Sequence, residues 1–373
     1  MNRNSKKTRH GVPPKNHSRT GLIISLIAIG ILLVFSVGAL VVFTNYVSKL
    51  NRVDVGNQTV TITPSPIPGA ELTENERTVL EDADAQLRDN LEAKADKNFD
   101  SKDVTNILLI GVDNDYLGGM DQLGNADGIL LVSINSKTEQ VVLTSFMRDS
   151  YVAAAGEDYN TKLTLTYHYG GTPLLINTME ANFGIPIDSY VLVNYINVVD
   201  IVDAFGGIDM EMNQSELYYT QQKIENVNYL TAQEAGANSL EGVLPGVVHL
   251  NGTQVAALLR IRLDGGNDQG RTQRARQVIL KLKEKATNMS FRELNDMANI
   301  VLPCVTTNLT QGEIFSLMLN SLSYFKYDMI SSRVPYEGSY HYENIYGSSM
   351  VVMDYTANKE YLYQSIYEGI LEP

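Results

Sequence analysis

The chain has 373 residues, 43 acidic and 29 basic side chains, and a formal charge of −14. This length can bury one or two hydrophobic cores, and the one cysteine, Cys304, excludes an internal disulfide and a multi-cysteine metal site. The net acidity argues against a nucleic-acid partner, because phosphate contacts require a basic surface. The first twenty residues differ from the rest: they hold six basic side chains and no acidic one. Without them the chain has 23 basic and 43 acidic groups, a charge of −20.

Residues 21–43 carry no charge over twenty-three positions. As a helix they would be about 34 Å long, enough to cross a bilayer core of about 30 Å. A cleaved signal peptide is the alternative, but its apolar region is normally only about 7 to 15 residues long. The six preceding cations place the amino terminus in the cytoplasm by the positive-inside rule, so residues from 44 onward are expected outside the cell. An outside domain without a cysteine pair fits a bacterium that does not rely on disulfides better than a eukaryotic secretory route, and we expect a bacterium of Gram-positive type.

Two further segments separate this anchor from the main domain. Residues 57–70 hold three prolines among small polar residues, which favours an extended spacer. Residues 72–97 predict a helix with a capping box of Thr73 and Glu76, interpreted as a solvated stalk or else as a partner-binding coiled coil. We therefore divide the chain into a cytoplasmic tail (1–20), a transmembrane anchor (21–43), a linker and stalk (44–103) and an extracellular domain (104–373).

The main domain alternates strand and helix candidates. Residues 106–113 form a short apolar run typical of a buried strand, and segments 128–134 and 140–147 flank turn residues as a hairpin does. Further strands are predicted at 189–195 and 208–212, and helices at 172–183, 197–205, 253–259 (capped by Asn251) and 271–287. This alternation predicts an α/β fold, an α/β/α sandwich with a central mixed sheet.

Arginines form the first candidate site. Five of them lie within seventeen positions of an otherwise acidic domain: Arg260, Arg262, Arg271, Arg274 and Arg276. Arg271 and Arg274 share a face in the first turn of a predicted helix, where cations oppose the helix dipole unless an anion is bound there. A phosphate or pyrophosphate is the natural ligand, and surface salt bridges are the alternative. Arg276 is expected to face away from this pair and to be exposed.

Aspartates form the second candidate site. Asp113 ends a predicted strand, Asp127 and Asp149 flank the hairpin, and Asp268 lies beside the glycine that opens the arginine-bearing helix. Ligand clefts form at strand ends in α/β sheets, and hard carboxylate oxygens suit Mg²⁺ bridging phosphate oxygens. Each aspartate taken alone could instead be a turn or cap residue. There is no phosphate-binding loop ending in Lys-Ser or Lys-Thr and no Gly-x-Ser-x-Gly elbow, so direct attack on phosphorus is the remaining chemistry.

An ordered series of motifs identifies a resemblance to the LytR-CpsA-Psr family over residues 104–287. The motifs are NILLIGVD, NADGILLVSIN, MRDSYV, KLTLTYHYGG, IPIDSYVLVNY, VDAFGGIDMEM, LNGTQVAALLRIR and GRTQRARQV. The resemblance implies a long apolar pocket for a polyprenyl tail and transfer of a glycopolymer from a lipid pyrophosphate to peptidoglycan. It also implies that Asp113 and Asp127 bind Mg²⁺. The residues that would hold the pyrophosphate are Arg148, Arg260, Arg262, Arg271 and Arg274.

The chain departs from the family pattern at two positions. The family usually has arginine where this chain has Asn125, and glutamine where it has Ala275. Loss of a charged hydrogen-bond donor typically costs about 1.5 to 3 kcal/mol. Either the remaining arginines suffice, or the protein is a weak or specialised member.

Three functions follow as expectations. The leading one is a membrane-anchored phosphotransferase that attaches teichoic acid, capsule or another wall polymer to peptidoglycan. Its lipid pocket would be lined partly by helices 172–183 and 197–205, Arg148 would act at the phosphate, and Asp149 or Asp268 would accept the hydroxyl proton. The alternatives are a non-catalytic sensor that binds polyprenyl phosphate and a hydrolase of lipid pyrophosphate.

Overall fold

The computed structural model describes residues 44–54 except 46, then 74–92, 99, 101–113, 123–261, 268–324, 326–345 and 347–370. The predicted tail, anchor and proline-rich spacer lie outside these residues. The chain divides into two compact units, Met1–Ser48 and Lys49–Pro373. Only four residues of the first unit are described, so the fold reported below is that of the second.

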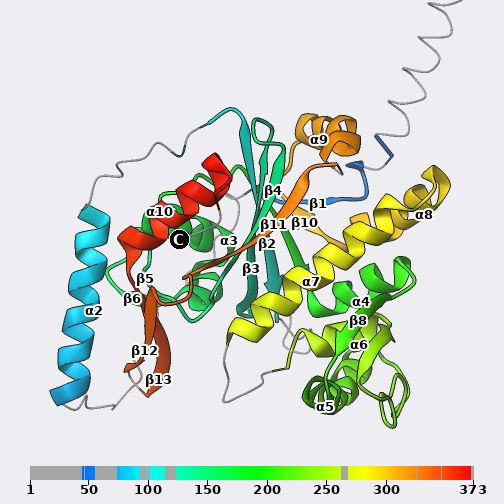
Figure 1. Cartoon of the computed structure of the whole chain (residues 1–373), viewed down its shortest axis with the longest axis horizontal. Coiled ribbons are helices and arrows are strands. Elements are labelled where there is room, and N and C mark those ends of the chain that lie inside the picture. The colour runs from blue at the N-terminus through cyan, green and yellow to red at the C-terminus, as the bar shows by residue number, and fades with distance from the viewer. Residues whose placement is uncertain are drawn as a thin grey trace, which may run out of the picture. The chain divides into compact units, whose positions relative to one another are not determined.

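A mixed β-sheet forms the centre of the second unit (Figure 1). Among the described residues it has seven strands, in the order β1-β10-β7-β2-β3-β4-β11. Their bounds are β1 Asn51–Arg52, β2 Val104–Val112, β3 Ala126–Asn135, β4 Gln140–Phe146, β7 Ser189–Asn194, β10 Thr306–Thr307 and β11 Asp328–Val334. β3 is antiparallel to β2 and to β4, whereas β7 is parallel to β2 and β11 is parallel to β4. The predicted α/β fold with a mixed central sheet is confirmed.

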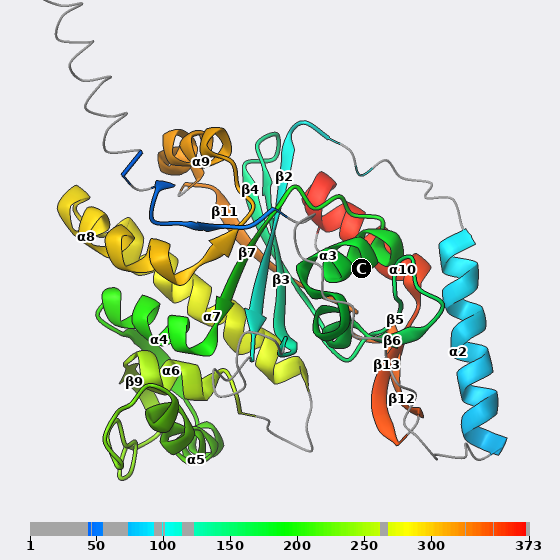
Figure 2. The same cartoon turned by 180° about the vertical axis from the view of Figure 1, so that it is seen from behind.

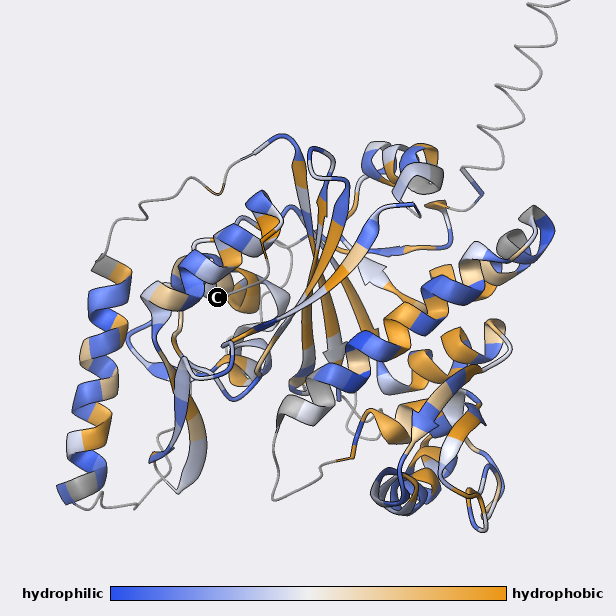
Figure 3. Cartoon of the chain, in the orientation of Figure 1, coloured by the Kyte–Doolittle hydropathy of each residue, from blue (hydrophilic) through white to orange (hydrophobic). Residues whose placement is uncertain are grey.

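Helices cover both faces of the sheet, and apolar residues concentrate in its strands (Figures 1 and 3). One face packs on α3 (Leu163–Phe183) and α10 (Tyr355–Tyr363), which continues into a π-helical turn at Gln364–Glu368. The other face packs on α7 (Asp268–Thr287) and α9 (Gln311–Tyr324). Because strand side chains alternate between faces, β2 directs Leu108 and Ile110 to the α3 face and Leu109 to the α7 face.

A helical group beside α7 has a hydrophobic core of its own (Figure 2). It consists of α4 Tyr195–Ala204, β8 Ile208–Met212, α5 Gln214–Leu230, β9 Gly246–Leu250 and α6 Gly252–Leu258. The predicted cap of α6 is confirmed: the Asn251 side chain accepts a hydrogen bond from the Gln254 N–H, and the Gln254 side chain bonds back to the Asn251 N–H. Next along the chain come α7, α8 (Phe291–Val301) and a 3₁₀ turn at Leu302–Cys304.

The hairpin and the helix predicted from local sequence signals at 128–147 and 172–183 are both present. The hairpin of β3 and β4 turns at residues 136–139, where the Asn135 side chain accepts hydrogen bonds from the N–H groups of Lys137 (2.9 Å) and Thr138 (3.1 Å). The predicted helix at 172–183 is the second part of α3, which is interrupted by non-helical backbone at Gly170 and Gly171. Gly171 has φ +64°, a conformation that suits glycine.

The helix predicted as a solvated stalk is instead packed against the domain. It spans Glu74–Glu92 (α2), and Ala83 and Leu87 on one face are buried in the core shared with α3 and α10. The Asp84 carboxylate accepts hydrogen bonds from the Tyr151 hydroxyl (2.8 Å) and the Asn160 amide (2.7 Å). The interpretation as a stalk is therefore wrong: four apolar positions along a largely charged helix, Val79, Leu80, Ala83 and Leu87, pack on the core. Its capping residue Thr73 lies outside the described residues.

Two small hairpins complete the fold around α2 and α3. β5 (Tyr151–Ala153) pairs with β6 (Asn160–Lys162), and β12 (Tyr340–Ile345) pairs with β13 (Ser348–Met353). Ser150 makes a parallel bridge to Val351, which links the hairpin of β12 and β13 to the end of β4. The segment after residue 287 therefore closes the same domain, as predicted.

Candidate active site

Asp113 and Asn125 lie together where β2 ends and β3 begins. The Asn125 backbone N–H donates a hydrogen bond to Asp113 Oδ1, and the Asn125 side-chain amide lies 3.4 Å from Oδ2. The Asp113 N–H in turn donates to the Asn125 carbonyl at 3.1 Å. Asn125, which stands where the family usually has arginine, therefore contacts the carboxylate at this strand end through neutral donors.

Asp127 and Arg148 form an ion pair at the same end of the sheet. Asp127 is on β3 and Arg148 follows β4, and antiparallel pairing of these strands brings the two side chains together. The pair is largely buried, with exposed side-chain fractions of 8% for Asp127 and 12% for Arg148. The Tyr195 hydroxyl, at the start of α4, lies 3.3 Å from the other Asp127 oxygen. Such burial strengthens charge interactions relative to water.

Asp149 is held between two cations beside this pair. Its carboxylate lies 3.0 Å from Lys162 Nζ and 3.8 Å from Arg148 Nε. Lys162 is the last residue of β6 and was not among the residues predicted for the site, although it opens the KLTLTYHYGG motif. Successive contacts therefore connect two cations and two carboxylates, in the order Lys162, Asp149, Arg148 and Asp127.

Arg260, which follows α6, and Arg274, on α7, have different roles. The Arg260 guanidinium lies over the Tyr195 ring, with its carbon 5.2 Å from the centroid, and donates to Asn226 Oδ1 at 2.6 Å. Since Tyr195 also contacts Asp127, Arg260 reaches the same site. Arg274 is 4% exposed, donates to the Ile261 carbonyl at 2.8 Å and lies 3.8 Å from Glu216. It fixes the chain after α6 against α7.

The remaining predicted site residues are only partly described. Arg262 lies outside the described residues. Asp268 and Arg271 are in the first turn of α7, but their side chains are not among those described. Arg276 is half-buried rather than exposed, so that expectation is wrong. Its guanidinium donates to Ser145 Oγ on β4 at 2.6 Å, and burial lowers the pKa of Arg276 to about 10.

An apolar pocket of about 300 Å³ opens behind the Asp127 and Arg148 pair, between the sheet and α7. Leu109, Gly111, Gly128, Val191 and Val193 form its sheet wall, and Ala275, Val278 and Ile279 of α7 form the opposite wall. Asp127 and Tyr195 are at its edge, so an apolar cavity and a charged cluster share residues. No group of three or more His, Cys, Asp or Glu side chains that could hold a metal ion occurs within the described ranges.

One of the two helices predicted to line this pocket does so. Ile201 of α4 is in its wall, as expected for helix 197–205. Residues 172–183 are in α3, on the opposite face of the sheet, where Leu175, Met179 and Phe183 fill the main core. That expectation is wrong because an apolar helix face does not tell which side of a sheet it covers. α7 takes its place.

The profile of the LytR_cpsA_psr family matches residues 71–365, most of the chain. The chain belongs to this family. The match begins near α2 and therefore includes the helix that packs on the core. It also contains every residue of the charged cluster described above.

Named relatives of this LytR_cpsA_psr protein include the polyisoprenyl-teichoic acid–peptidoglycan teichoic acid transferase TagU of Bacillus cereus. The two are 30% identical over 216 residues, which is 57% of this chain and 63% of TagU, so the match spans less than two thirds of the relative. The Enterococcus faecalis protein of the same name is 28% identical over 62% of this chain and 70% of its own length.

Solved structures of the family share the fold. TagV of Bacillus subtilis superposes with a TM-score of 0.55 at 24% identity, covering 72% of this chain and 98% of TagV. TagT with bound octaprenyl pyrophosphate lipid superposes with a TM-score of 0.52 at 21% identity, covering 74% of this chain and 95% of TagT. At these identities the likeness establishes the fold alone.

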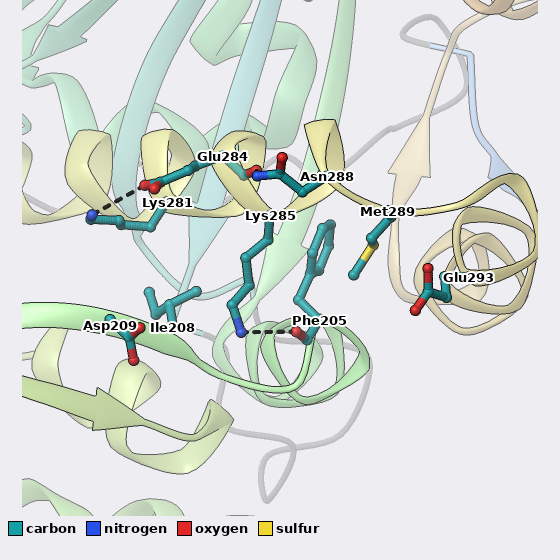
Figure 4. A pocket seen from close by; sticks show the side chains of 9 residues that line it. All are labelled: Phe205, Ile208, Asp209, Lys281, Glu284, Lys285, Asn288, Met289 and Glu293. Atoms are coloured by element: carbon teal, nitrogen blue, oxygen red, sulfur yellow. Dashed lines mark hydrogen bonds and ion pairs between the residues drawn. The ribbon is translucent and has the colours of Figure 1, made fainter.

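A second pocket, of about 370 Å³, lies between the end of α4 and the later turns of α7 (Figure 4). Its charged groups have structural partners. Lys285 donates to the Phe205 carbonyl at 3.1 Å, Lys281 pairs with Glu284 at 3.1 Å, and Asp209 pairs with His249 at 2.7 Å. None of the predicted site residues of this LytR_cpsA_psr protein lines it. In the described part of the chain no helix is long and apolar enough to cross a bilayer.

Proposed function

We propose that this protein is a membrane-anchored phosphotransferase that moves a wall glycopolymer from a polyprenyl pyrophosphate carrier to peptidoglycan. The observation that carries the proposal is the junction of an apolar cavity with a buried cluster of arginines and aspartates. Its substrate must therefore combine an apolar chain with an anionic head. A polyprenyl pyrophosphate has this construction, because its tail gains from burial and its phosphates need charged donors.

The relatives support the same substrate. The TagU proteins are named teichoic acid transferases that act on peptidoglycan, and TagT structures are described with octaprenyl pyrophosphate and with a wall teichoic acid lipid intermediate. We extend this activity to the present chain with teichoic acid, capsule or a similar polymer as the donor. The predicted anchor would leave the amino terminus in the cytoplasm and the domain outside the cell, facing both the lipid carrier and the wall.

The proposed reaction transfers one phosphoryl group. An acceptor hydroxyl on peptidoglycan attacks the phosphorus that carries the polymer, a new phosphorus–oxygen bond forms, and the bond to the lipid phosphate breaks. Arg148 and Arg260 stabilise the charge that develops on the phosphate oxygens, and Arg274 holds Ile261, the residue after Arg260. The hydroxyl proton passes to Asp149, which lies beside Arg148, or to Asp268.

We also propose Mg²⁺ as the cofactor. The donors fit this ion, because Asp113 and Asp127 supply hard carboxylate oxygens at neighbouring strand ends, and Mg²⁺ usually takes only one or two carboxylates and completes its shell with phosphate and water. When bound, the ion would neutralise phosphate charge. Asp113 and Asp127 would hold the ion, and Arg148, which pairs with Asp127, keeps that carboxylate in place.

A transfer assay with the full chain in detergent micelles tests the proposal. Lipid-linked polymer, peptidoglycan glycan and Mg²⁺ should yield linked polymer and lipid monophosphate. Arg148→Ala should lower transfer about ten- to more than a hundredfold, because a charged hydrogen bond contributes about 1.5 to 3 kcal/mol. Arg292→Ala is the matched control, because Arg292 is 92% exposed on α8. Lipid binding without any linked product would overturn the proposal.

The same assay separates the two alternatives. Lipid monophosphate released equally with and without the glycan would indicate a pyrophosphate hydrolase. Retained lipid binding with neither product would indicate a sensor, a function favoured by the neutral Asn125 beside Asp113 and by Ala275 in the pocket wall. Chelation of Mg²⁺ should stop transfer, and unchanged transfer after chelation would remove the ion from the proposal.

A further inference from the structure

A polar cavity of about 580 Å³ lies outside the site described above, between α2, the turn before β12 and the start of α10. These elements lie side by side in both views of the chain (Figures 1 and 2). Gln86 and Asp89 of α2 line one side of the cavity, Tyr336 and Tyr340 line another, and Asp354 lines the start of α10. We call this space the hairpin cavity. The mechanism above makes no use of it.

The lining of the hairpin cavity selects against anions. None of the described residues that line it is a lysine or arginine, whereas carboxylates, amides and tyrosine rings are present. Among the described lining residues only the imidazole of His341 can carry a positive charge, and its Nε2 already lies 3.5 Å from Glu343 Oε1. A phosphate would therefore find no lysine or arginine here, in contrast to the charged cluster that borders the apolar pocket. A neutral sugar fits, because its C–H face can pack on an aromatic ring while its hydroxyls donate to carboxylates and amide oxygens.

The tyrosine side of the cavity is held in place before any ligand binds. Asn358 is fully buried; its side chain accepts from the Tyr336 N–H at 3.1 Å and donates to Ser339 Oγ at 3.0 Å. The Asp354 N–H donates to the Ser339 carbonyl at 2.9 Å. One face of Tyr340 is covered by Arg333, 5.7 Å from the ring centroid. A prearranged surface of this kind loses little conformational entropy on binding.

The hairpin cavity is connected to the candidate active site through β13. The Val351 N–H donates to the Asp149 carbonyl at 2.9 Å, and Asp354 follows Val351 by three residues, at most about 10 Å along the chain. A ligand in the cavity therefore lies close to the loop that carries Arg148 and Asp149. An extended polymer could occupy the cavity and present one of its hydroxyls at that loop.

We propose that the hairpin cavity binds a neutral glycan chain and holds the acceptor polymer for the reaction. The identification of this glycan as the acceptor rests on the proposed function, whereas the binding of a neutral glycan does not. Tyr340 and Tyr336 supply the stacking surface, and Gln86, Asp89 and Asp354 supply hydrogen-bonding groups.

Binding of chitotetraose, an uncharged amino-sugar oligomer, to the full chain in detergent micelles tests the inference by calorimetry, without donor lipid. We expect saturable binding that Tyr340→Ala weakens at least tenfold and that Tyr340→Phe preserves. Gln86→Ala, an exposed change on α2, should weaken binding two- to tenfold without affecting the fold. Tyr229→Ala, at a 68% exposed tyrosine of α5, is the control.

The possible outcomes separate this inference from the proposed function. Absence of saturable binding, or binding that neither Tyr340→Ala nor Gln86→Ala changes, would overturn the inference even if polymer transfer occurs. Binding that follows the expected pattern in a protein that transfers no polymer would support a glycan site while the transferase proposal fails. Binding of inorganic phosphate would also contradict the inference if it is tighter than binding of chitotetraose and is weakened by Tyr340→Ala and Gln86→Ala.

Discussion

The two faces of the central sheet are built from the same strands but have different contents. Toward α3 and α10, large side chains such as Phe146, Phe183 and Tyr190 fill the space completely. Toward α7, the buried cluster is small and an apolar pocket of about 300 Å³ remains open. One face is therefore a densely buried core, and the other provides space for a ligand.

A pair of glycines explains part of this difference. Gly111 of β2 and Gly128 of β3 are paired across the strands, and both line the pocket. Neither glycine has a φ in the left-handed region, and a Cβ on Gly128 would meet only ordinary contacts with Gly111 at 3.6 Å. Backbone conformation therefore does not require glycine here. The absent side chains keep the wall of the pocket open.

The largest expected effect tests the packed face. Phe183 is fully buried, with its ring centroid 4.9 Å from that of Phe146, so Phe183→Ala should lower the free energy of unfolding by about 3 to 5 kcal/mol. Val193→Ala, in the wall of the pocket, should lower it by about 1 kcal/mol or less because the removed methyl groups already border open space. Chemical denaturation measures both, and equal losses would contradict the division between the faces.

Much of this architecture was predictable from the sequence because its signals are local. Apolar runs bounded by turn residues predicted β2, β3 and β4, and Asn251 marked the start of α6. The side of the sheet that a helix covers is set by the path of the chain, so helix 172–183 was assigned to the wrong face. The docking of α2 depends on partners far away in the sequence, such as Tyr151 and Asn160, and was missed for the same reason.

The second prediction concerns the open face. Gly128→Val adds a side chain that favours strand structure, so the free energy of unfolding should change by about 1 kcal/mol or less. The new side chain would occupy the pocket, and we expect binding of polyprenyl phosphate to weaken at least tenfold, measured by calorimetry in micelles. Thr105→Val, an exposed change at the other end of the same strand pair, is the control. Unchanged lipid binding in Gly128→Val would show that the pocket does not hold the lipid.

The candidate site was predictable in composition but not in pairing. Asp113, Asp127, Arg148 and Asp149 were all marked by their positions at strand ends or by family motifs, and Arg260 reaches the same cluster through Tyr195. Tyr195 and Lys162 were missed, although both belong to motifs quoted for the family, because a tyrosine or lysine beside a strand has many structural uses. Arg276 was assigned to solvent because helix periodicity alone does not reveal that Ser145 of β4 lies opposite it.

The smallest expected effect concerns the edge of the open face, at Asn125. In the present chain its backbone N–H already donates to Asp113, and any residue except proline would preserve that contact. Asn125→Arg adds one charged donor to a site where Arg148 and Arg260 already face the proposed phosphate, so we expect a gain smaller than the loss on removing Arg148. Transfer should rise two- to tenfold, which corresponds to about 0.4 to 1.4 kcal/mol. Asn125→Gln should leave transfer unchanged, since it adds length without charge. If transfer occurs only in Asn125→Arg, the natural protein is a sensor, and its open face holds the lipid without acting on it.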